Sequence, residues 1–387
     1  MQAQAWSHAN PVGIRWGRGC RADLLPVLEQ QRCLIVCSRG GRLRLEADPV
    51  LAAAMANPRF VWVDDVQANP DLAALQHQVD ANAHHNIEAV VAVGGGSVLD
   101  SAKALALALS PAAAGVPIRQ LISNGPQYPW GTALPLYALP TTAGTGSEVT
   151  PFATVWDHAA QRKLSLTGPA MFPRFAWVDP ELTDGLALDV TLATGLDAIN
   201  QAAESIWNKH MTPITEAFAQ RALVLGFEAL PRLLNDPIDT MARDAMAQAS
   251  VLSGLAISQT RTALCHSMSY PLTAHFGVPH GWACAFTMPA VLRLNRSADD
   301  GRLQRLEATL NQGQALTRSL QERFEQLHVS MDVRDRIKAQ VPALSDLTAL
   351  VGEMFTPGRA DNNLAPIDAS VIERVLVESW NESQPKT

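Results

Sequence analysis

The sequence predicts two domains: an α/β domain with a doubly wound parallel sheet over residues 1–185, and an all-α domain over residues 186–387. Two observations support this prediction. In the first half, short continuous apolar runs end in glycine-rich loops, which is typical of parallel strands buried on both faces. Past residue 186 such strand ends disappear and long helical patterns take over. A chain of 387 residues is long enough for two sizeable cores.

The α/β half is expected to open with a strand and hairpin from Pro11 to Arg18, followed by a short helix from Ala22 to Gln31. Further apolar runs predict buried strands at Arg32–Cys37, Phe60–Val63, Ala89–Val93 and Leu134–Leu139, and helical spacing predicts a helix at Leu72–His85. Strands that alternate with helices favour a parallel sheet. In the second half, the clearest helical patterns are Thr215–Leu230 and Met241–Ala256.

Composition and charge narrow the class of protein. Apolar residues make up 47% of the chain and charged residues 17%, which indicates a globular protein. A formal net charge of -7 and the lack of a basic run argue against nucleic acid as a partner. The N-terminus lacks the apolar region of a signal peptide, and no apolar stretch is long enough to cross a bilayer, so we expect a cytoplasmic protein that binds no membrane. Five scattered cysteines without CxxC spacing are expected to be reduced thiols.

Two polar loops follow strands of the first half. Gly94-Gly95-Gly96-Ser97 leads into a helix whose N-terminal N–H groups and dipole would suit a pyrophosphate. Ser97 is expected to cap that helix, with Asp100 as its capping-box partner. By itself this loop could equally be a tight strand-to-helix turn. The second loop, from Thr141 to Glu148, is rich in hydroxyls and glycines and would suit phosphate and ribose.

Two blocks of the second half hold candidate metal ligands. Asp197 and Gln201 are four residues apart, which places them on one face of a helix. His266 lies in a helical, apolar-periodic segment, and His280 stands between a proline and a glycine at a turn or helix entry. Two imidazoles with one or two oxygen donors suit Fe(II) or Zn(II) with an open position for substrate. Cys265 adjoins His266, but neighbours on a helix point about 100° apart, so it is not expected to be a ligand.

Together these blocks resemble the iron-containing (group III) alcohol dehydrogenases, which have a dehydroquinate synthase-like fold. In that family the metal ligands are an Asp, a His four residues on, and two later His. Asp197, His266 and His280 fall on three of these positions, and Gln201 stands at the fourth. An amide oxygen is a poorer ligand than imidazole. Gln201 and the run from His266 through Ser-Met-Ser-Tyr-Pro-Leu-Thr-Ala resemble the hydroxyethylphosphonate dehydrogenase (phosphonoacetaldehyde reductase) branch.

The resemblance implies a nicotinamide cofactor, with the pyrophosphate on the glycine loop and the nicotinamide on the threonine-rich loop. The cofactor-binding residues it implies are Ser38, Asn69, Gly95, Gly96, Ser97, Asp100, Thr141, Thr142, Thr145, Lys163 and Leu182. An acidic residue at the end of the second strand normally binds the adenosine ribose and repels a 2′-phosphate. Ser38 stands there, with Arg39 next to it and Arg42 and Arg44 following, which favours NADPH over NADH.

The resemblance also implies a reaction, hydride transfer between the nicotinamide and a carbonyl polarised by the metal, in a cleft between the domains of a homodimer. The branch implies that phosphonoacetaldehyde is reduced to 2-hydroxyethylphosphonate. Asp197, His266 and His280 would act in catalysis through the metal, and Arg261 through the phosphonate. A second candidate for phosphonate binding is Arg359 with Asn362 and Asn363, and weak candidates for a proton relay are Tyr270 and His275.

Three alternatives stay open at this point. The chain could be a general short-chain alcohol or aldehyde dehydrogenase of the same family. It could catalyse an elimination, like dehydroquinate synthase, with no net turnover of NAD. It could also bind a cofactor without catalysis, with Gln201 marking a lost metal site.

Overall fold

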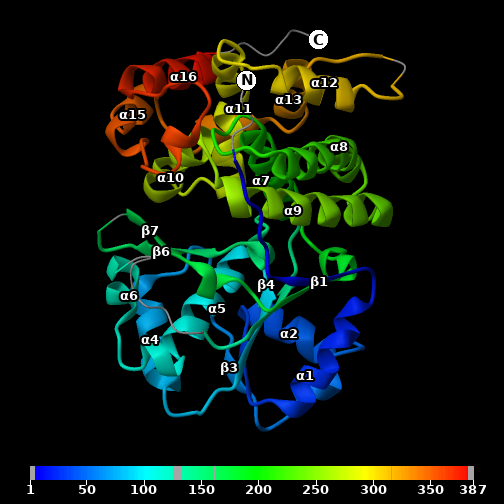
Figure 1. The fold of residues 1–387 in the computed structure, drawn as a ribbon, viewed down its shortest axis with the longest axis vertical. Coiled ribbons are helices and arrows are strands. Elements are labelled where there is room, and N and C mark those ends of the chain that lie inside the picture. The colour runs from blue at the N-terminus through cyan, green and yellow to red at the C-terminus, as the bar shows by residue number, and fades with distance from the viewer. Residues whose placement is uncertain (1–4, 125–132, 161, 315, 382–387) are drawn as a thin grey trace. The chain divides into compact units, whose positions relative to one another are not determined.

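The computed structural model describes residues 5–124, 133–160, 162–314 and 316–381, and these residues form two compact units (Figure 1). One unit is Asn10–Gly185. The other runs from Leu186 onward and includes the described residues before Asn10. The first unit contains a parallel sheet with helices and the second is helical, which confirms the predicted fold class.

The α/β unit has a six-stranded sheet in which every neighbouring pair is parallel. Its strands are β1 (Gly13–Trp16), β2 (Cys33–Val36), β3 (Val61–Val63), β4 (Ala89–Gly94), β5 (Leu136–Pro140) and β8 (Phe175–Val178), in the order β1-β8-β5-β4-β2-β3. The predicted opening hairpin is wrong, because β1 pairs in parallel with β8. Gly17 and Gly19, both with positive φ, turn the chain into the 3-10 helix Cys20–Leu24 instead of a second strand.

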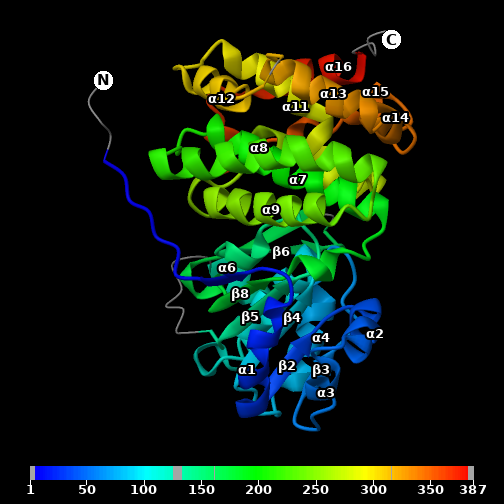
Figure 2. The same cartoon turned by 90° about the vertical axis from the view of Figure 1, so that its right-hand side faces the viewer.

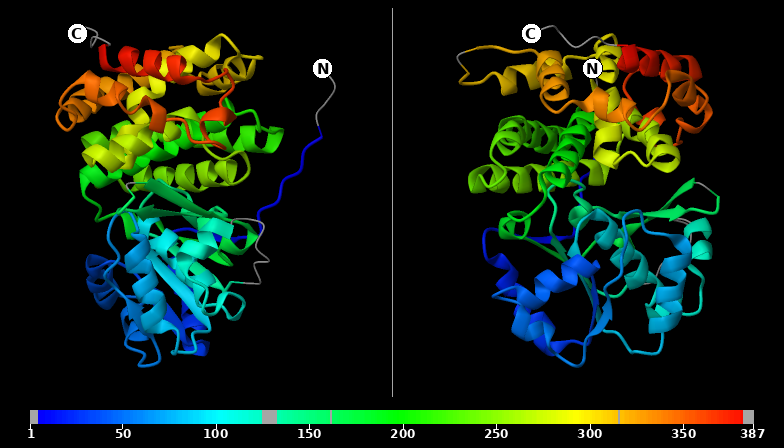
Figure 3. Two further views of the ribbon diagram at one scale, coloured as in Figure 1. Left: turned by 90° about the vertical axis from the view of Figure 1, so that its left-hand side faces the viewer. Right: turned by 180° about the vertical axis from the view of Figure 1, so that it is seen from behind.

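Side chains of the central strands alternate between two cores, one on each face of the sheet. Leu34 and Val36 join the core under α4 (Leu72–Asn82), α5 (Gly96–Ala108) and α6 (Ile118–Asn124). Cys33 and Ile35 join the core under α1 (Leu25–Gln30), α2 (Arg39–Ala47) and α3 (Ala52–Met55). The helices of the two faces can be followed in Figures 2 and 3. Burial on both faces explains why these strands have continuous apolar sequences.

A small antiparallel pair, β6 (Phe152–Asp157) and β7 (Arg162–Thr167), lies outside the main sheet. Neither of its strands was predicted from the sequence, and nor was β8, although β8 is the continuous apolar run Phe-Ala-Trp-Val. The sequence of β7, Arg-Lys-Leu-Ser-Leu-Thr, alternates polar and apolar residues and is mostly half-buried or exposed, so it lacks the continuous apolar pattern of a strand buried on both faces.

The helical unit is organised around α7 (Leu188–Ile206), which packs against α8 (Pro213–Asn235), α9 (Thr240–Thr260) and α11 (His280–Arg296). Its other helices are α10 (Leu264–Phe276), α12 (Arg302–Leu310), α13 (Leu320–Ser330), α14 (Val333–Lys338), α15 (Leu344–Thr348) and α16 (Ala369–Asn381). None of the helices among the described residues combines the length and the apolar character needed to cross a membrane.

The buried His328 of α13 ties that helix to α11, because its Nε2–H donates to the carbonyl of Ala285 at 2.7 Å. Its Nδ1 is buried and has no hydrogen-bond partner. Burial lowers the pKa of His328 from 6.5 to about 3, and the positive charges of Arg334 and Arg293 act in the same direction. The folded protein therefore holds this imidazole neutral.

This lowered pKa makes the helical unit sensitive to acid. Between pH 6.5 and 3 the unfolded chain binds a proton here that the folded chain excludes, so the free energy of unfolding falls as the pH falls through this window. We expect the loss between pH 7 and pH 5 to be about 2 kcal/mol smaller in His328→Gln, measured by urea denaturation. His210→Gln, at an exposed position, is the control. Equal losses in wild type and His328→Gln would contradict this assignment.

Candidate metal centre and cofactor loops

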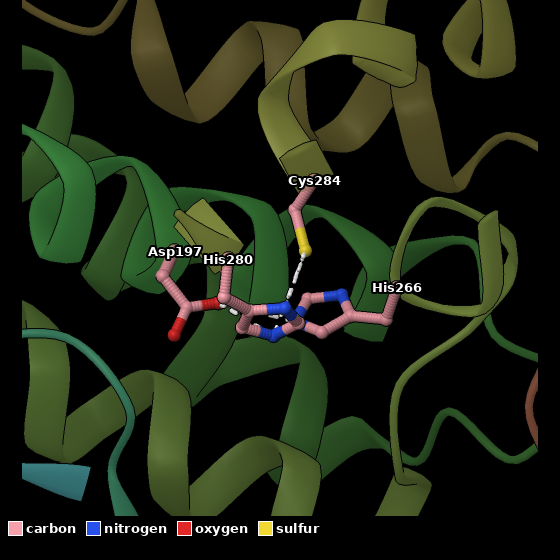
Figure 4. A group of neighbouring side chains, drawn as sticks. All are labelled: Asp197, His266, His280 and Cys284. Carbon is pink, nitrogen blue, oxygen red and sulfur yellow. Dashed lines mark hydrogen bonds and ion pairs between the residues drawn. The ribbon is translucent and has the colours of Figure 1, made fainter. Parts of the chain in front are cut away.

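Four potential metal-ligating side chains of the helical unit converge on one point (Figure 4). Asp197 comes from α7, His266 from α10, and His280 and Cys284 from α11. One ligand atom from each lies within 4.8 Å of all the others. His266 Nε2 is 3.2 Å from Asp197 Oδ1, and His280 Nε2 is 3.9 Å from the same oxygen. Three of these residues were predicted as ligands from the sequence.

His266 is oriented by a buried carboxylate, that of Glu204 on α7. Its Nδ1–H donates to Glu204 Oε2 at 2.6 Å, which leaves Nε2 to face the cluster. The same carboxylate accepts backbone N–H bonds from Ala263 at 2.8 Å, Cys265 at 2.5 Å and His266 at 3.3 Å. A carboxylate behind an imidazole in this way is the usual support of a metal-binding histidine, because it fixes both the tautomer and the ring orientation.

His280 is oriented by Ser269 and by the close packing of α11 on α7. The Ser269 hydroxyl donates to the His266 carbonyl at 2.7 Å, so it accepts from His280 Nδ1–H at 3.3 Å. The next residue, Gly281, lies so close to α7 that a Cβ there would be 1.8 Å from the carbonyl oxygen of Ala193. Since Ala193 is one turn before Asp197, this backbone contact brings His280 to the carboxylate.

The four groups perturb one another strongly. Burial alone would raise the pKa of Asp197, but the hydrogen bond from His266 and the charge of His280 hold it below its ordinary value. Burial alone would lower the pKa of His266, but the negative charges of Cys284 and Glu204 raise it well above its ordinary value. Burial alone would raise the pKa of Cys284, but the two imidazoles lower it to about 7. The carboxylates of Asp197 and Glu204 and the thiol of Cys284 thus favour a positive charge between the four side chains, which a divalent cation would supply.

The donor set fits a divalent metal ion in both chemistry and orientation. Carboxylate oxygen and imidazole nitrogen are ligands of Fe(II) and Zn(II). His266 turns Nε2 toward the cluster while Glu204 holds its Nδ1, and His280 Nε2 faces Asp197 while its Nδ1 contacts both Ser269 and Cys284. Gln201, the fourth predicted ligand, is hydrogen-bonded to Asp197, and its oxygen is 3.3 Å from the Ser253 hydroxyl. Its role as a metal ligand stays a prediction.

In the α/β unit, the two predicted cofactor loops pack against each other. A Cβ at Gly96 would lie 2.6 Å from Thr145 Cγ2, and one at Gly95 would lie 3.1 Å from Thr142. The amide of Thr141 donates to the Gly94 carbonyl at 3.0 Å. The glycines are therefore required for this contact between the loops, in addition to any approach of a phosphate.

The predicted capping box on α5 is wrong. The helix begins at Gly96 with Gly95 as its N-cap, so Ser97 already lies in the first turn and cannot cap it. The Ser97 hydroxyl instead accepts from the amide of Asn69 at 3.2 Å, and Asn69 has a positive φ of 59°. Both predicted cofactor residues thus lie together at the start of α5.

Asp100 and the buried Lys103 of α5 hold the second loop in place. Lys103 Nζ donates to Ser147 Oγ at 2.9 Å and to the Thr150 carbonyl at 2.9 Å. Asp100 accepts from Ser147 Oγ at 2.6 Å and from the amide of Thr154 at 2.7 Å. Burial lowers the pKa of Lys103 to about 8 and raises that of Asp100. In this structure Asp100 supports the loop through hydrogen bonds to its backbone and hydroxyl groups.

The remaining predicted cofactor residues, Ser38, Lys163 and Leu182, lie on different elements of the α/β unit. Ser38 caps α2, since its hydroxyl accepts from the Gly41 amide at 3.1 Å. The charge of Lys163, on β7, opposes in small part the burial that raises the pKa of Asp100, and so acts near the start of α5. Leu182 packs on the core under α1–α3. The cofactor-binding roles of all these residues stay predictions.

Arg261 occupies a strained position between α9 and α10. Its φ of 61° and ψ of -177° lie in a region that is essentially restricted to glycine and costs ~1–3 kcal/mol for other residues. The Arg261 carbonyl accepts from Thr260 Oγ at 2.8 Å and Asn208 Nδ2 at 3.3 Å, which holds this backbone. Partial desolvation and the charge of Arg359 lower the pKa of Arg261. Within the described part of the chain, no carboxylate pairs with its guanidinium.

The loop that carries Arg359 is fastened beside this turn. Asn362 Nδ2 donates to the carbonyls of Thr262 at 3.1 Å and Gly358 at 2.9 Å. Asn363 is fully buried and bonds to Asn295. These two amides therefore hold the loop, and Arg359 is the member of the predicted group that carries charge.

Of the two candidates for a proton relay, Tyr270 stacks on His280 with ring centroids 6.2 Å apart, whereas His275 pairs with Glu353.

Sequence reasoning missed Glu204 and Cys284. Both follow a predicted ligand at helical spacing: Glu204 is seven residues after Asp197, and Cys284 is four residues after His280. Residues four or seven apart share a helix face. This spacing was the available signal, but a carboxylate or thiol on a helix is common without any such role.

Comparison with known proteins places the chain in a family. A family model described as iron-containing alcohol dehydrogenase matches residues 11–180, and one described as the C-terminal part of the Fe-containing alcohol dehydrogenase family matches residues 191–380. The chain therefore belongs to the iron-containing alcohol dehydrogenases, as the sequence motifs predicted.

Individual relatives within this family are also similar. The chain is 43% identical over 248 residues to the phosphonoacetaldehyde reductase of Streptomyces viridochromogenes, covering 62% of this chain and 61% of that protein. It is 36% identical over 230 residues to the probable alcohol dehydrogenase EutG of Salmonella typhimurium, covering 59% and 55%. These matches span less than two thirds of either relative. The crystal structure of sulfoacetaldehyde reductase from Bifidobacterium kashiwanohense in complex with NAD+ has a TM-score of 0.85 and 30% identity, and covers 98% of this chain and 100% of that one.

Gly281→Ala tests the packing that positions His280. The added Cβ would meet a backbone carbonyl that cannot rotate away, so α11 has to move off α7. We expect the free energy of unfolding to fall by ~1–3 kcal/mol and the bound metal per chain, measured by elemental analysis, to fall with it. Gly352→Ala is the control, since its Cβ would meet nothing within 4 Å. A full metal complement in Gly281→Ala would contradict the role of this contact.

Proposed function

We propose that the protein is a metal-dependent oxidoreductase that interconverts an aldehyde and a primary alcohol with a nicotinamide cofactor. The convergence of Asp197, His266 and His280 in a chain of this family is the observation that carries the proposal. These residues would hold the metal. When bound, a divalent metal supplies Lewis acidity that polarises a carbonyl oxygen. Glu204 and Ser269 fix the two imidazoles, so the site is preorganised by the protein.

We further propose that the substrate is phosphonoacetaldehyde, which would be reduced to 2-hydroxyethylphosphonate. Arg261 supports this substrate because its exposed cation has no carboxylate partner among the described residues, lies beside a second arginine, and is held by a strained backbone. Guanidinium groups bind phosphonate-like oxygens in a bidentate manner. The similarity to a phosphonoacetaldehyde reductase points to the same substrate.

The second candidate is a general short-chain alcohol or aldehyde dehydrogenase. The similarity to EutG, a probable alcohol dehydrogenase, favours it. Oxidation of a simple alcohol gives no reason for Arg261, whose backbone is strained and whose side chain is a cation, in the turn that leads to His266. The eliminating enzyme and the non-catalytic binder differ from both in that they predict no net oxidation of NADH or NADPH.

A substrate comparison tests the proposal. With protein reconstituted with Zn(II) or Fe(II), we expect loss of reduced cofactor absorbance to be much faster with phosphonoacetaldehyde than with butanal at equal concentration. Equal or reversed preference would favour the general dehydrogenase. No turnover with either aldehyde, in protein that contains metal, would contradict an oxidoreductase.

Arg261→Gly removes the side chain that would bind the phosphonate and should leave folding intact. Glycine adopts φ 61° and ψ -177° without strain. We expect the KM for phosphonoacetaldehyde to rise roughly 10- to 100-fold, since a hydrogen bond to a charged group contributes ~1.5–3 kcal/mol. The KM for butanal should stay unchanged and serves as the internal control. Similar changes for both aldehydes would show that Arg261 does not bind the phosphonate.

For the cofactor we propose NADPH over NADH, on the absence of a carboxylate at Ser38 and the exposed cation at Arg39. Arg42 contributes less to this proposal, because it pairs with Asp64 at 2.5 Å and with Glu46, and its guanidinium lies over Trp62. The sulfoacetaldehyde reductase neighbour, by comparison, was crystallised with NAD+.

Arg39→Ala tests this choice. We expect kcat/KM with NADPH to fall roughly tenfold, as for the loss of one exposed phosphate contact of ~1.4 kcal/mol, and kcat/KM with NADH to stay the same. A wild-type enzyme that uses NADH better than NADPH would contradict the proposal.

A further inference from the structure

We propose that Cys284 supplies a thiolate donor to the metal ion held by Asp197, His266 and His280, and that Gln201 does not ligate it. Cys284 can play this part only if the metal site proposed above exists. The proposal gives that site a donor set of one carboxylate, two imidazoles and one thiolate, where the family resemblance implies a carboxylate and imidazoles only.

The position of Cys284 on α11 favours ligation. It lies four residues after His280, so both side chains project from one face of the helix. Its Sγ is 3.7 Å from His280 Nε2 and 3.8 Å from His280 Nδ1. Around a tetrahedral Zn(II), with bonds of about 2.05 Å to nitrogen and 2.3 Å to sulfur, the two donor atoms would be about 3.5 Å apart. The observed separation is therefore close to that of two ligands of one ion.

The surroundings of Cys284 distinguish it from a structural thiol. In Figure 4 its sulfur points at the two imidazoles. Cys265 is a useful contrast, because it is equally buried and directly precedes His266. Yet its sulfur is not part of the group of donor atoms, as expected for neighbours on a helix.

Gln201 already has a defined role. Its side chain is hydrogen-bonded to Asp197, and its oxygen, the atom that would bind a metal, is 3.3 Å from the Ser253 hydroxyl, which donates more closely to the Ser250 carbonyl at 2.9 Å. An amide oxygen is also a neutral, weak ligand beside a buried thiolate. We therefore infer that Gln201 orients the Asp197 carboxylate and acts as a positioning residue.

A thiolate changes the metal that the site prefers. Soft sulfur ligands favour Zn(II) over Mg(II)- or Mn(II)-like ions, and the combination of thiolate and imidazole is common for zinc. Catalytic zinc sites usually keep one of four positions open and sometimes become five-coordinate in the transition state, so with four protein donors the carbonyl oxygen would have to enter as a fifth. We expect the protein to bind Zn(II) more tightly than Fe(II), although its family is named for iron.

Cobalt substitution tests the ligand directly. Co(II) bound by a thiolate shows an intense sulfur-to-metal charge-transfer band in the near ultraviolet, which nitrogen and oxygen donors do not produce. We expect this band, at one Co(II) per chain, in wild type, in Cys265→Ser and in Gln201→Leu. Cys284→Ser should lose the band and bind Zn(II) at least tenfold more weakly in competition with a chromophoric chelator.

The outcomes separate this proposal from the proposed function. Stoichiometric Co(II) without the band, together with aldehyde reduction, overturns the thiolate and leaves the function intact. A band that persists in Cys284→Ser also overturns it. Wild-type protein that binds no metal overturns both proposals. If Cys284→Ser does not fold, X-ray absorption of the wild-type zinc protein decides, since one sulfur at about 2.3 Å is expected and its absence would refute the thiolate.

Discussion

The metal centre depends on the burial of one carboxylate, that of Glu204. A buried, unpaired carboxylate costs several kcal/mol, and here three backbone amides and the His266 ring offset that cost. The amides belong to the first turn of α10, where the helix dipole also favours a negative charge. A single side chain of α7 therefore fixes where α10 begins, which way His266 faces and which of its nitrogens carries the proton.

The same interaction explains how Arg261 can be held in a strained conformation. Glu204 fixes Ala263 from one side, while Thr260 and Asn208 hold the Arg261 carbonyl from the other. The chain between these anchors is too short to relax. Strain of this kind persists only where the surroundings over-determine the backbone. The proposed anion-binding residue and the proposed metal-binding histidine thus belong to one rigid turn, so a substitution of either residue should also affect the position of the other.

The sequence predicted most of the fold but only part of the site, for physical reasons. Strands buried on both faces have continuous apolar runs, whereas β7 alternates polar and apolar residues and β1 was misread as half of a hairpin. Asp197, His266 and His280 were predicted because their spacing matches that of the metal ligands in the family that the sequence resembles. Glu204 did not, because only the structure shows that its carboxylate is buried under another helix. Ser97 was assigned as a cap because a shift of one or two residues in the start of α5 is invisible in the sequence.

The proposed thiolate and the proposed arginine contact support each other through charge. A divalent ion held by Asp197 and three neutral donors would carry a net positive charge, and could attract a phosphonate by itself. With Cys284 as a second anionic donor, the charges of the ion and its direct ligands cancel, and the Glu204 carboxylate behind His266 adds a further negative charge, so the centre holds no surplus attraction for an anion. A negatively charged substrate then needs a separate cation. Arg261, beside Arg359 and without a carboxylate partner among the described residues, is placed in the chain to supply it.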